Sequence, residues 1–195
     1  EKVVSENPEL VDYKVLSVTK KMFGEINLSD SFFQSFKEDY IGFDKWFLKK
    51  SDDIAYVTIN RGNILSFLFL KVEGSDENYS DITPILTPKK RLKIGTFKVI
   101  SNGVRLGERF MKIIFDNAIQ YQVEEIYVTI FNKREEQKRL INLLEDWGFV
   151  FHGTKETVNG SELVYVRDFH PKFNRANPKL TFPYISKNSN IFMIP

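Results

Sequence analysis

One stretch of the sequence joins a strand pattern, a short glycine loop and the clearest amphipathic helix of the chain. Residues 91–101 (RLKIGTFKVIS) are β-rich, and Gly103 and Gly107 follow closely. From Leu106 onward, apolar side chains recur at helical spacing. A further β-rich run follows at 125–131 (EIYVTIF). A strand, a helix and a strand in this order predict a helical crossover within a sheet, and so a chain of the α/β class.

The residues before this crossover predict strands and two short helices. Alternation over 13–18 predicts a first strand. Ser29 or Asp30 is expected to cap a helix that runs to about Tyr40, and a second helix is expected over 43–50. Two β-rich runs, 53–60 and 63–72, flank Arg61-Gly62, which is the spacing of a hairpin turn. The polar stretch 73–88 is predicted to be a loop because it contains Gly74, Pro84 and Pro88.

The residues after the crossover predict one helix and two strands. Leucines at helical spacing and Trp147 predict a helix from about Arg134 that ends at Gly148. Strands are expected over 149–154 and 162–167. The resulting order of elements is β, α, α, β, β, β, α, β, α, β, β, which predicts a mixed sheet with helices.

The chain is predicted to divide into a body, 1–168, and a C-terminal arm, 169–195. The arm contains four prolines, scattered aromatic residues, four basic residues and no acidic residue. Because the chain ends abruptly after apolar residues, we expect the arm to lead into a further segment or to dock on a partner or second domain.

Composition excludes several classes of protein. The 195 residues include no Cys and 2 His, which argues against a disulfide scaffold, an iron–sulfur protein, a zinc site and a cysteine nucleophile. The longest apolar runs are far shorter than the roughly 20 residues of a membrane span. We therefore expect a cytoplasmic protein without a metal and without a membrane partner.

The glycine loop before the amphipathic helix has the features of a phosphate site. Backbone N–H groups and the positive end of the helix dipole converge there, and glycine lets an anion approach the backbone. The loop matches neither GxxxxGK[ST] nor GxGxxG, so a nucleoside triphosphate or a dinucleotide is not favoured.

The order of elements and two motifs resemble the Gcn5-related N-acetyltransferase (GNAT) family. The signature of that family, (Gln/Arg)-x-x-Gly-x-(Gly/Ala), lies between its fourth strand and third helix. Aligned here, Asn102 takes the place of Gln/Arg, Arg105 that of the first Gly, and Gly107 that of the last. The run 144–149 (LEDWGF) is similar to the family's Tyr-x-x-x-Gly-Phe. The resemblance covers about 13–168.

The resemblance implies a fold, a cosubstrate and an activity. The fold is a mostly antiparallel sheet of about seven strands, with the fourth and fifth strands splayed around the crossover helix. The activity is acyl transfer from acetyl-CoA to the amine of a small molecule, peptide or protein, with a backbone N–H stabilising the oxyanion. The implied cofactor-binding residues are Phe97, Lys98, Val99, Asn102, Gly103, Val104, Arg105, Leu106, Gly107 and Glu108.

Several positions depart from the family pattern. Arg105 replaces a glycine, although its guanidinium could supply charge to a phosphate. Leu144 stands where many members keep a tyrosine that protonates the departing thiolate, and Gln137 is near the place of an asparagine. The fourth strand contains no Glu, which is the general base of some members.

Other side chains are candidates for proton transfer. The catalytic residues we predict are Tyr127, Tyr165 and Glu162. Further candidate bases are Glu38, Asp39, Glu73 and His152. The acceptor side in this family corresponds to an aromatic-rich segment that is expected to be mostly core, with members Phe32, Phe33, Phe36, Tyr40, Phe43, Trp46 and Phe47.

Two other functions compete with the enzyme. A catalytically inactive GNAT-like interaction module would explain the missing Tyr and Glu. A nucleic-acid-binding regulator would use the basic run 89–93 and the basic arm, and is the less favoured of the two because such runs are usually solvated. The retained glycines favour the acyltransferase.

Overall fold

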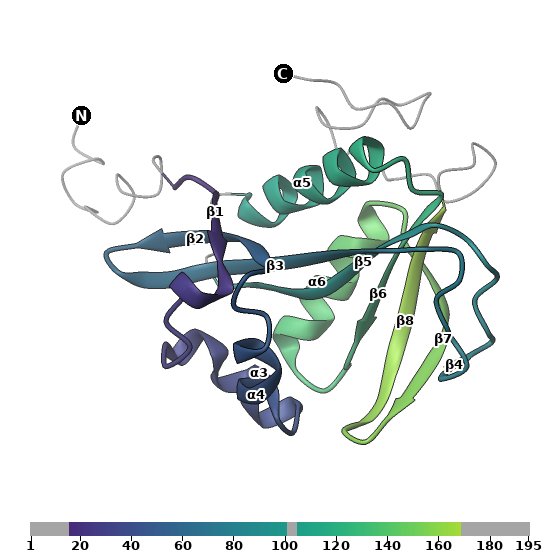
Figure 1. Ribbon diagram of the computed structural model, residues 1–195, viewed down its shortest axis with the longest axis horizontal. Helices are drawn as coiled ribbons and strands as arrows, with labels where there is room; N and C mark the ends of the chain where they lie inside the picture. Colours follow the sequence, from purple (N-terminus) through teal and green to yellow (C-terminus); the bar gives the residue numbers. More distant parts are fainter. Residues whose placement is uncertain (1–15, 101–104, 169–195) are drawn as a thin grey trace. The chain divides into compact units, whose positions relative to one another are not determined.

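The computed structural model describes residues 16–100 and 105–168 (Figure 1). Its elements follow in the order β1 (Thr19–Met22), η2 (Phe23–Glu25), η3 (Ser31–Phe33), α3 (Gln34–Asp39), α4 (Phe43–Leu48), β2 (Ile54–Asn60), β3 (Asn63–Glu73), β4 (Ile82–Thr83), β5 (Arg91–Val99), α5 (Leu106–Gln120), β6 (Glu125–Ile130), α6 (Glu135–Asp146), β7 (Val150–Thr157) and β8 (Gly160–Asp168).

The strands form an eight-stranded sheet in the order β1-β2-β3-β5-β6-β8-β7-β4. The strands β5 and β6 pair in parallel, with Arg91–Ile94 opposite Glu125–Val128. Because α5 lies between these two strands in the chain, the predicted helical crossover is confirmed, and so is the mixed α/β class. The other registered pairs are antiparallel.

By its internal contacts the chain divides into two compact units. Unit 1 comprises 1–69 and 96–106, and unit 2 comprises 70–95 and 107–195. The C-terminal arm that the sequence predicts, 169–195, lies outside the described residues.

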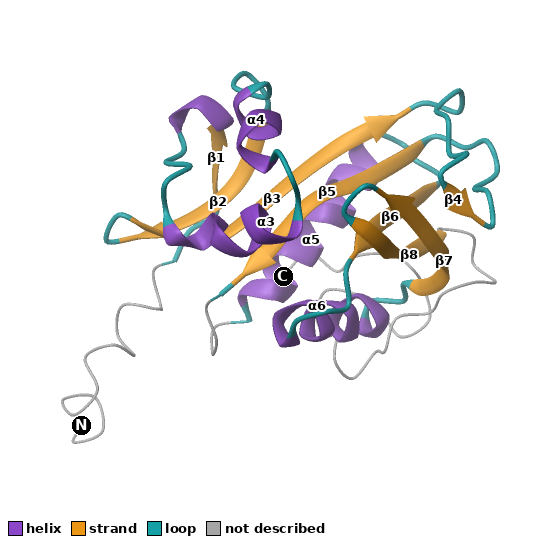
Figure 2. Ribbon diagram, turned by 90° about the horizontal axis from the view of Figure 1, so that it is seen from below, coloured by secondary structure: helices purple, strands orange, loops and turns teal. Residues whose placement is uncertain are grey.

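Unit 1 is built around the β2–β3 hairpin. Arg61 and Gly62, at the predicted turn, have φ angles of 50° and 85°, the pair of positive values that a type I′ turn requires. One face of the hairpin, with Val57 and Phe67, packs against aromatic side chains of α3, α4 and the preceding turns. Figure 2 shows the helices α3 and α4 beside the strands of the hairpin. The aromatic-rich segment is therefore mostly core, as predicted.

Asp30 caps the turn that begins the first helical segment. Its Oδ1 accepts a hydrogen bond from the backbone N–H of Phe32 at 2.8 Å. Its Oδ2 accepts one from the N–H of Ile64 in β3 at 3.2 Å. The predicted cap is confirmed, and the same carboxylate also fixes this segment to the hairpin.

Unit 2 contains the antiparallel set β6, β8, β7 and β4 together with α6 and most of α5 (Figure 1). Trp147, directly after α6, is 1% exposed, and its ring centroid lies 5.7 Å from that of Phe115 in α5. The chain then turns at Gly148, whose φ of 85° suits glycine. The predicted helix end and its buried stripe are confirmed.

Two predicted elements are placed differently by the structure. The first strand occupies 19–22 rather than 13–18; residues 16–18 precede it without regular structure, and 13–15 lie outside the described residues. The stretch 73–88 contains the short strand β4, which pairs with Lys155 and Thr154 of β7. The sequence pattern did not predict these two strands, because β1 is polar and β4 is two residues long. The sheet therefore has eight strands rather than seven.

Among the described residues, no helix combines the length and the apolar character that crossing a membrane requires.

Candidate functional site

The strand β5 carries the predicted cofactor-binding residues Phe97, Lys98 and Val99. Phe97 is 7% exposed, and the other two are half-buried. The ammonium of Lys98 donates to the carbonyl oxygen of Phe32 at 2.7 Å and to Ser35 Oγ at 2.8 Å. The side chain of Lys98 is therefore committed to η3 and α3, and what this strand can offer a ligand is its backbone.

The described backbone resumes at Arg105, after the predicted residues Asn102, Gly103 and Val104, which lie outside the described residues. Arg105 is exposed and has a φ of 48°. This is the left-handed region, which costs a residue with a Cβ roughly 1–2 kcal/mol and which glycine adopts freely. The position that aligns with the family's glycine thus has the backbone conformation that favours glycine.

The first turn of α5 contains the predicted residues Leu106, Gly107 and Glu108. Leu106 is 2% exposed and belongs to the core. A Cβ on Gly107 would lie 2.9 Å from Cδ2 of Leu143 in α6. Close packing between these two helices is therefore one physical reason for a glycine at 107, so a substitution there would test packing as well as ligand binding.

A buried carboxylate lies at the end of β3 in unit 2. The Glu73 side chain is 1% exposed, and its Oε2 accepts hydrogen bonds from the hydroxyls of Tyr127 at 2.6 Å and Tyr79 at 3.1 Å. Its Oε1 accepts from the ammonium of Lys71 at 3.0 Å, and the ammonium of Lys93 lies 3.8 Å away. We call Lys71, Glu73, Tyr79, Lys93 and Tyr127 the Glu73 network. It joins β3, β5, β6 and the segment before β4.

The network fixes the protonation of its members. Burial opposes ionisation of Glu73, but the hydrogen bonds from Tyr127 and Lys71 and the nearby lysine charges outweigh it, so the pKa of this carboxyl is lowered. Burial and the hydrogen bond to Glu73 raise the pKa of Tyr127. Burial also lowers the pKa of Lys93. Glu73 is therefore a weak base, and Tyr127 holds its proton strongly.

The three predicted catalytic residues do not share one face of the sheet. Tyr127 lies opposite Val166 in the β6–β8 ladder, and Val128 lies opposite Tyr165. Because side chains alternate along a strand, Tyr127 and Glu162 are on one face and Tyr165 is on the other. Glu162 is 4% exposed and pairs in register with Lys155 of β7.

Tyr165 lies beside the end of α6. Its hydroxyl donates to Oε1 of Glu145 at 3.3 Å, and burial followed by the charge of Glu145 raises its pKa. Leu144, the neighbour of Glu145, is 0% exposed. The position of the family's tyrosine is therefore occupied by a core leucine. Tyr165 comes near this position only through its hydrogen bond to Glu145, the residue after Leu144.

Two further candidates are used within the fold. The amide oxygen of Gln137 accepts from the backbone N–H groups of Lys133 and Arg134, at 2.8 and 3.0 Å, and so caps α6. His152 Nε2 lies 2.8 Å from the carbonyl oxygen of Pro84. Both side chains have a structural role that accounts for them.

Within the basic run 89–93, Lys89 and Arg91 form ion pairs inside unit 2. Lys89 pairs with Asp168 at 2.6 Å and with Glu125 at 3.3 Å, and Arg91, 1% exposed, pairs with Glu125 at 2.6 Å. The ammonium of Lys90 donates to the carbonyl oxygen of Tyr121. Two of the run's basic side chains are therefore engaged with carboxylates of the same unit, which weakens the nucleic-acid alternative.

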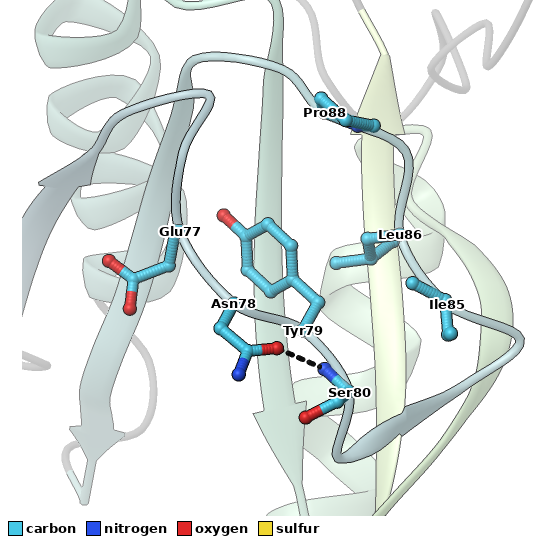
Figure 3. A pocket seen from close by; sticks show the side chains of 7 residues that line it. All are labelled: Glu77, Asn78, Tyr79, Ser80, Ile85, Leu86 and Pro88. Carbon is cyan, nitrogen blue, oxygen red and sulfur yellow. Dashed lines mark hydrogen bonds between the residues drawn. The ribbon is translucent and has the colours of Figure 1, made fainter.

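A depression of about 240 Å³ lies in the segment before and after β4 (Figure 3). Its lining comes entirely from residues 77–88, with the ring of Tyr79 on one side and Leu86 on the other. Asn78 Oδ1 is already used by the N–H of Ser80, at 2.9 Å. Tyr79 is the one member of the Glu73 network in this lining, and none of the described residues predicted to be catalytic or cofactor-binding is part of it, so we do not assign the depression to the site.

Within 16–100 and 105–168, no three or more His, Asp or Glu side chains are grouped so that they could hold a metal ion.

Sequence reasoning identified Tyr127 and Glu73 separately but not as parts of one network. Lys71 gave no signal, and Lys93 was predicted only as part of the basic run 89–93, because a lysine on a strand usually faces solvent. The four side chains come from three strands, and only the register of the sheet brings them together.

Known proteins resemble this chain in fold rather than in sequence. No protein-family model matches the sequence, and no curated protein matches it significantly. Among solved structures, a GNAT family acetyltransferase from Elizabethkingia anophelis with acetyl-CoA bound matches 78% of this chain and 97% of its own, at 9% identity and a TM-score of 0.54. The chain has the GNAT fold.

Two other solved structures that match this chain are enzymes with different named activities. FeeM, an N-acyl amino acid synthase from uncultured soil microbes, has 9% identity and a TM-score of 0.54, with 79% of this chain and 93% of FeeM covered. The polyamine N-acetyltransferase of Drosophila melanogaster has 13% identity and a TM-score of 0.51, with 78% and 99% covered. At these identities the likeness establishes the GNAT fold.

Proposed function

We propose that the chain is a GNAT-type acyl-CoA N-acyltransferase that transfers an acetyl group from acetyl-CoA to a primary amine. The observation that carries this proposal is the backbone at Arg105. Its φ of 48° puts an arginine in a glycine-favouring conformation directly before α5, at the position that aligns with the family's phosphate-binding loop. Backbone strain at a non-glycine residue is a pointer to function.

The described donors suit a pyrophosphate. The first turn of a 15-residue helix offers N–H groups and the positive end of its dipole, and a guanidinium precedes it. In the proposal, Arg105 and the N–H groups of α5 hold the phosphates, together with residues 102–104. The backbone of Phe97–Val99 holds the pantetheine arm. Acetyl-CoA, when bound, supplies the activated acyl group.

The reaction also needs side chains that accept and donate protons. The amine must be neutral before it attacks, and Glu162 is the base we propose because Glu73 has a lowered pKa and four neighbouring donors. We assign no acid among the predicted tyrosines, because the proton of Tyr127 is held by Glu73, and Tyr165 lies on the opposite face of the sheet from Glu162 with its hydroxyl donating to Glu145. The acceptor is an amine of a small molecule, a peptide or a protein, and the described residues do not select among these.

The first test is a thermal-shift titration with acetyl-CoA, CoA, ATP and NAD. A ligand at 100 times its Kd stabilises the folded protein by about 2.7 kcal/mol, so binding of CoA species is readily seen. We expect shifts with CoA and acetyl-CoA only. Absence of any CoA shift would remove the proposal.

Arg105→Gly separates strain from binding. We expect it to stabilise the fold by about 1 kcal/mol, because glycine adopts the left-handed region freely, and to weaken acetyl-CoA about tenfold by loss of the guanidinium. Arg61→Gly is the matched control, since Arg61 has a φ of 50° in the hairpin turn. It should stabilise similarly and leave the acetyl-CoA affinity unchanged. Equal affinities in the two variants would contradict the role of Arg105.

A catalytically inactive GNAT-like module is the second candidate. It is favoured by Leu144, which is fully buried where many family members keep a tyrosine. An N-acyltransferase releases the CoA thiol from acetyl-CoA when an amine is present, and an inactive module does not. The release can be followed with spermidine, a free amino acid and a short peptide as amines. Binding of acetyl-CoA without amine-dependent thiol release would favour the module.

A further inference from the structure

Lys98 is the charged residue of β5 that belongs to unit 1, and its side chain contacts η3 and α3. Besides its two hydrogen bonds to Phe32 and Ser35, its ammonium lies 4.9 Å from the ring centroid of Phe32 and 5.6 Å from that of Phe36. Two oxygen acceptors and two aromatic faces therefore surround one ammonium. This combination is well suited to an alkylammonium ion.

The ammonium of Lys98 lies where η3 passes into α3. Its acceptors are the carbonyl oxygen of Phe32 in η3 and the hydroxyl of Ser35 in the first turn of α3. Phe33, the residue before α3, offers no side-chain cap. The ammonium therefore supplies directional bonds at a helix junction that its own cap residue does not supply.

A second charged residue, Asp30, belongs to the segment itself and ties it to β3. Asp30 accepts from the N–H groups of Phe32 and of Ile64 in β3. The segment Asp30–Asp39 is thus held to β3 by a carboxylate and to β5 by an ammonium. These are two directional ties on the same short stretch of chain, added to an aromatic core that is not directional.

We propose that Lys98 is a positioning residue that ties the segment Asp30–Asp39 to β5, so that the acceptor amine meets the strand that carries the acyl donor. This inference rests on the proposed function, in which the backbone of Phe97–Val99 holds the pantetheine arm. The backbone of Lys98 serves the donor, while its side chain orders the acceptor side.

The tie itself is tested by amide hydrogen exchange on the full chain. Lys98→Met keeps most of the apolar stem and removes the ammonium. We expect exchange of the amides at 33–40 to rise about tenfold. The control is Lys37→Met, which removes an α3 ammonium paired with Asp44 at 2.9 Å, and we expect less than twofold change there. Equal exchange in Lys98→Met and wild type would overturn the proposal.

The functional arm uses acetyl-CoA and spermidine as probes. We expect Lys98→Met to raise the KM for spermidine about tenfold and to keep the Kd for acetyl-CoA within twofold of wild type. A tenfold loss of acetyl-CoA affinity with an unchanged KM would overturn the proposal, because Lys98 would then serve the donor. If wild type binds no acetyl-CoA, the proposed function fails, and the exchange experiment alone decides whether the tie exists.

Chemical rescue separates the ammonium from mere packing. Lys98→Ala leaves room beside Phe32, Ser35 and Phe36, and n-propylammonium can occupy it. We expect n-propylammonium, but not n-propanol, to restore slow exchange at 33–40. Equal restoration by both compounds would show that volume rather than charge holds the segment, and would overturn the role of the ammonium. A circular-dichroism melt of each variant confirms that it is folded.

Discussion

The two units bury different kinds of side chain. Unit 1 has an aromatic core in which Phe33 contacts five other phenylalanine rings at centroid distances of 5.2 to 6.5 Å. Unit 2 buries the Glu73 network and the ion pair of Arg91 with Glu125 beside its apolar residues. Apolar contacts tolerate small shifts of geometry, whereas buried hydrogen bonds and charges require defined partners. The two units should therefore respond differently to conservative substitution.

The largest effect is expected at Phe33, which is 0% exposed. Phe33→Ala should lower the free energy of unfolding by about 3–5 kcal/mol, because it removes ring contacts and leaves a cavity. Phe33→Leu should cost less than about 1.5 kcal/mol, because another apolar side chain fills most of the space. Urea unfolding measures both. A leucine variant as unstable as the alanine variant would show that this core is as specific as a polar network.

Glu73 provides the matching test in unit 2. Glu73→Ala should cost about 3 kcal/mol, because it leaves Tyr127, Tyr79 and Lys93 without their buried acceptor. Glu73→Gln keeps the shape but should still cost about 2 kcal/mol, since the amide cannot balance the lysine charges. The measurement is again urea unfolding. Near-complete recovery in the glutamine variant would mean that shape, not charge, matters here.

The dependence of stability on pH sharpens the same contrast. The pKa of Glu73 is lowered in the folded protein from its ordinary 4.5. The folded protein therefore favours the ionised form of Glu73 more than the unfolded chain does. This stabilisation is present above pH 4.5 and is lost as the pH falls through the lowered pKa. The difference in unfolding free energy between wild type and Glu73→Gln should shrink on acidification. A constant difference would contradict the ionised state of Glu73.

The smallest effect concerns two buried hydroxyls of unit 1. Thr58 and Ser66 are both 0% exposed, face each other across β2 and β3, and have no hydrogen-bond partner within the described residues. Thr58→Val should stabilise the protein by about 1 kcal/mol, because an unpaired hydroxyl is costly to bury. Thr96, also buried but not among the unpartnered groups, is the control site. If Thr58→Val destabilises the protein instead, the Thr58 hydroxyl has a hydrogen-bond partner in solution.

Much of the fold could be predicted because its signals are local. The hairpin at Arg61-Gly62, the stripe of α5, the cap at Asp30 and the stop at Gly148 each depend on a few neighbouring residues. The strands β1 and β4 escaped prediction because a short or polar strand is defined by its partner. The pairing of β4 with β7 joins residues more than seventy positions apart.

Features of the candidate site likewise depend either on neighbouring residues or on residues far apart in the chain. The loop before α5 is predicted to bind phosphate from its glycine spacing and stays a prediction, while Arg105 has a φ in the region that favours glycine. The Glu73 network and the contacts of Lys98 could not be found, because they depend on side chains from different strands and helices. The separation of Tyr165 from Tyr127 onto opposite faces follows from the β6–β8 register, which the sequence does not specify.

By itself the sequence determined most of the order of strands and helices, apart from β4 and the place of β1, and the helical crossover, because hydrophobic periodicity and turn chemistry act over a few residues. Only the tertiary structure decided which charged side chains became partners: Glu73 with two tyrosines, Lys98 with Phe32 and Ser35, and the run 89–91 with Glu125 and Asp168. The reason is physical, since a charge can be buried only where distant parts of the chain bring it a partner.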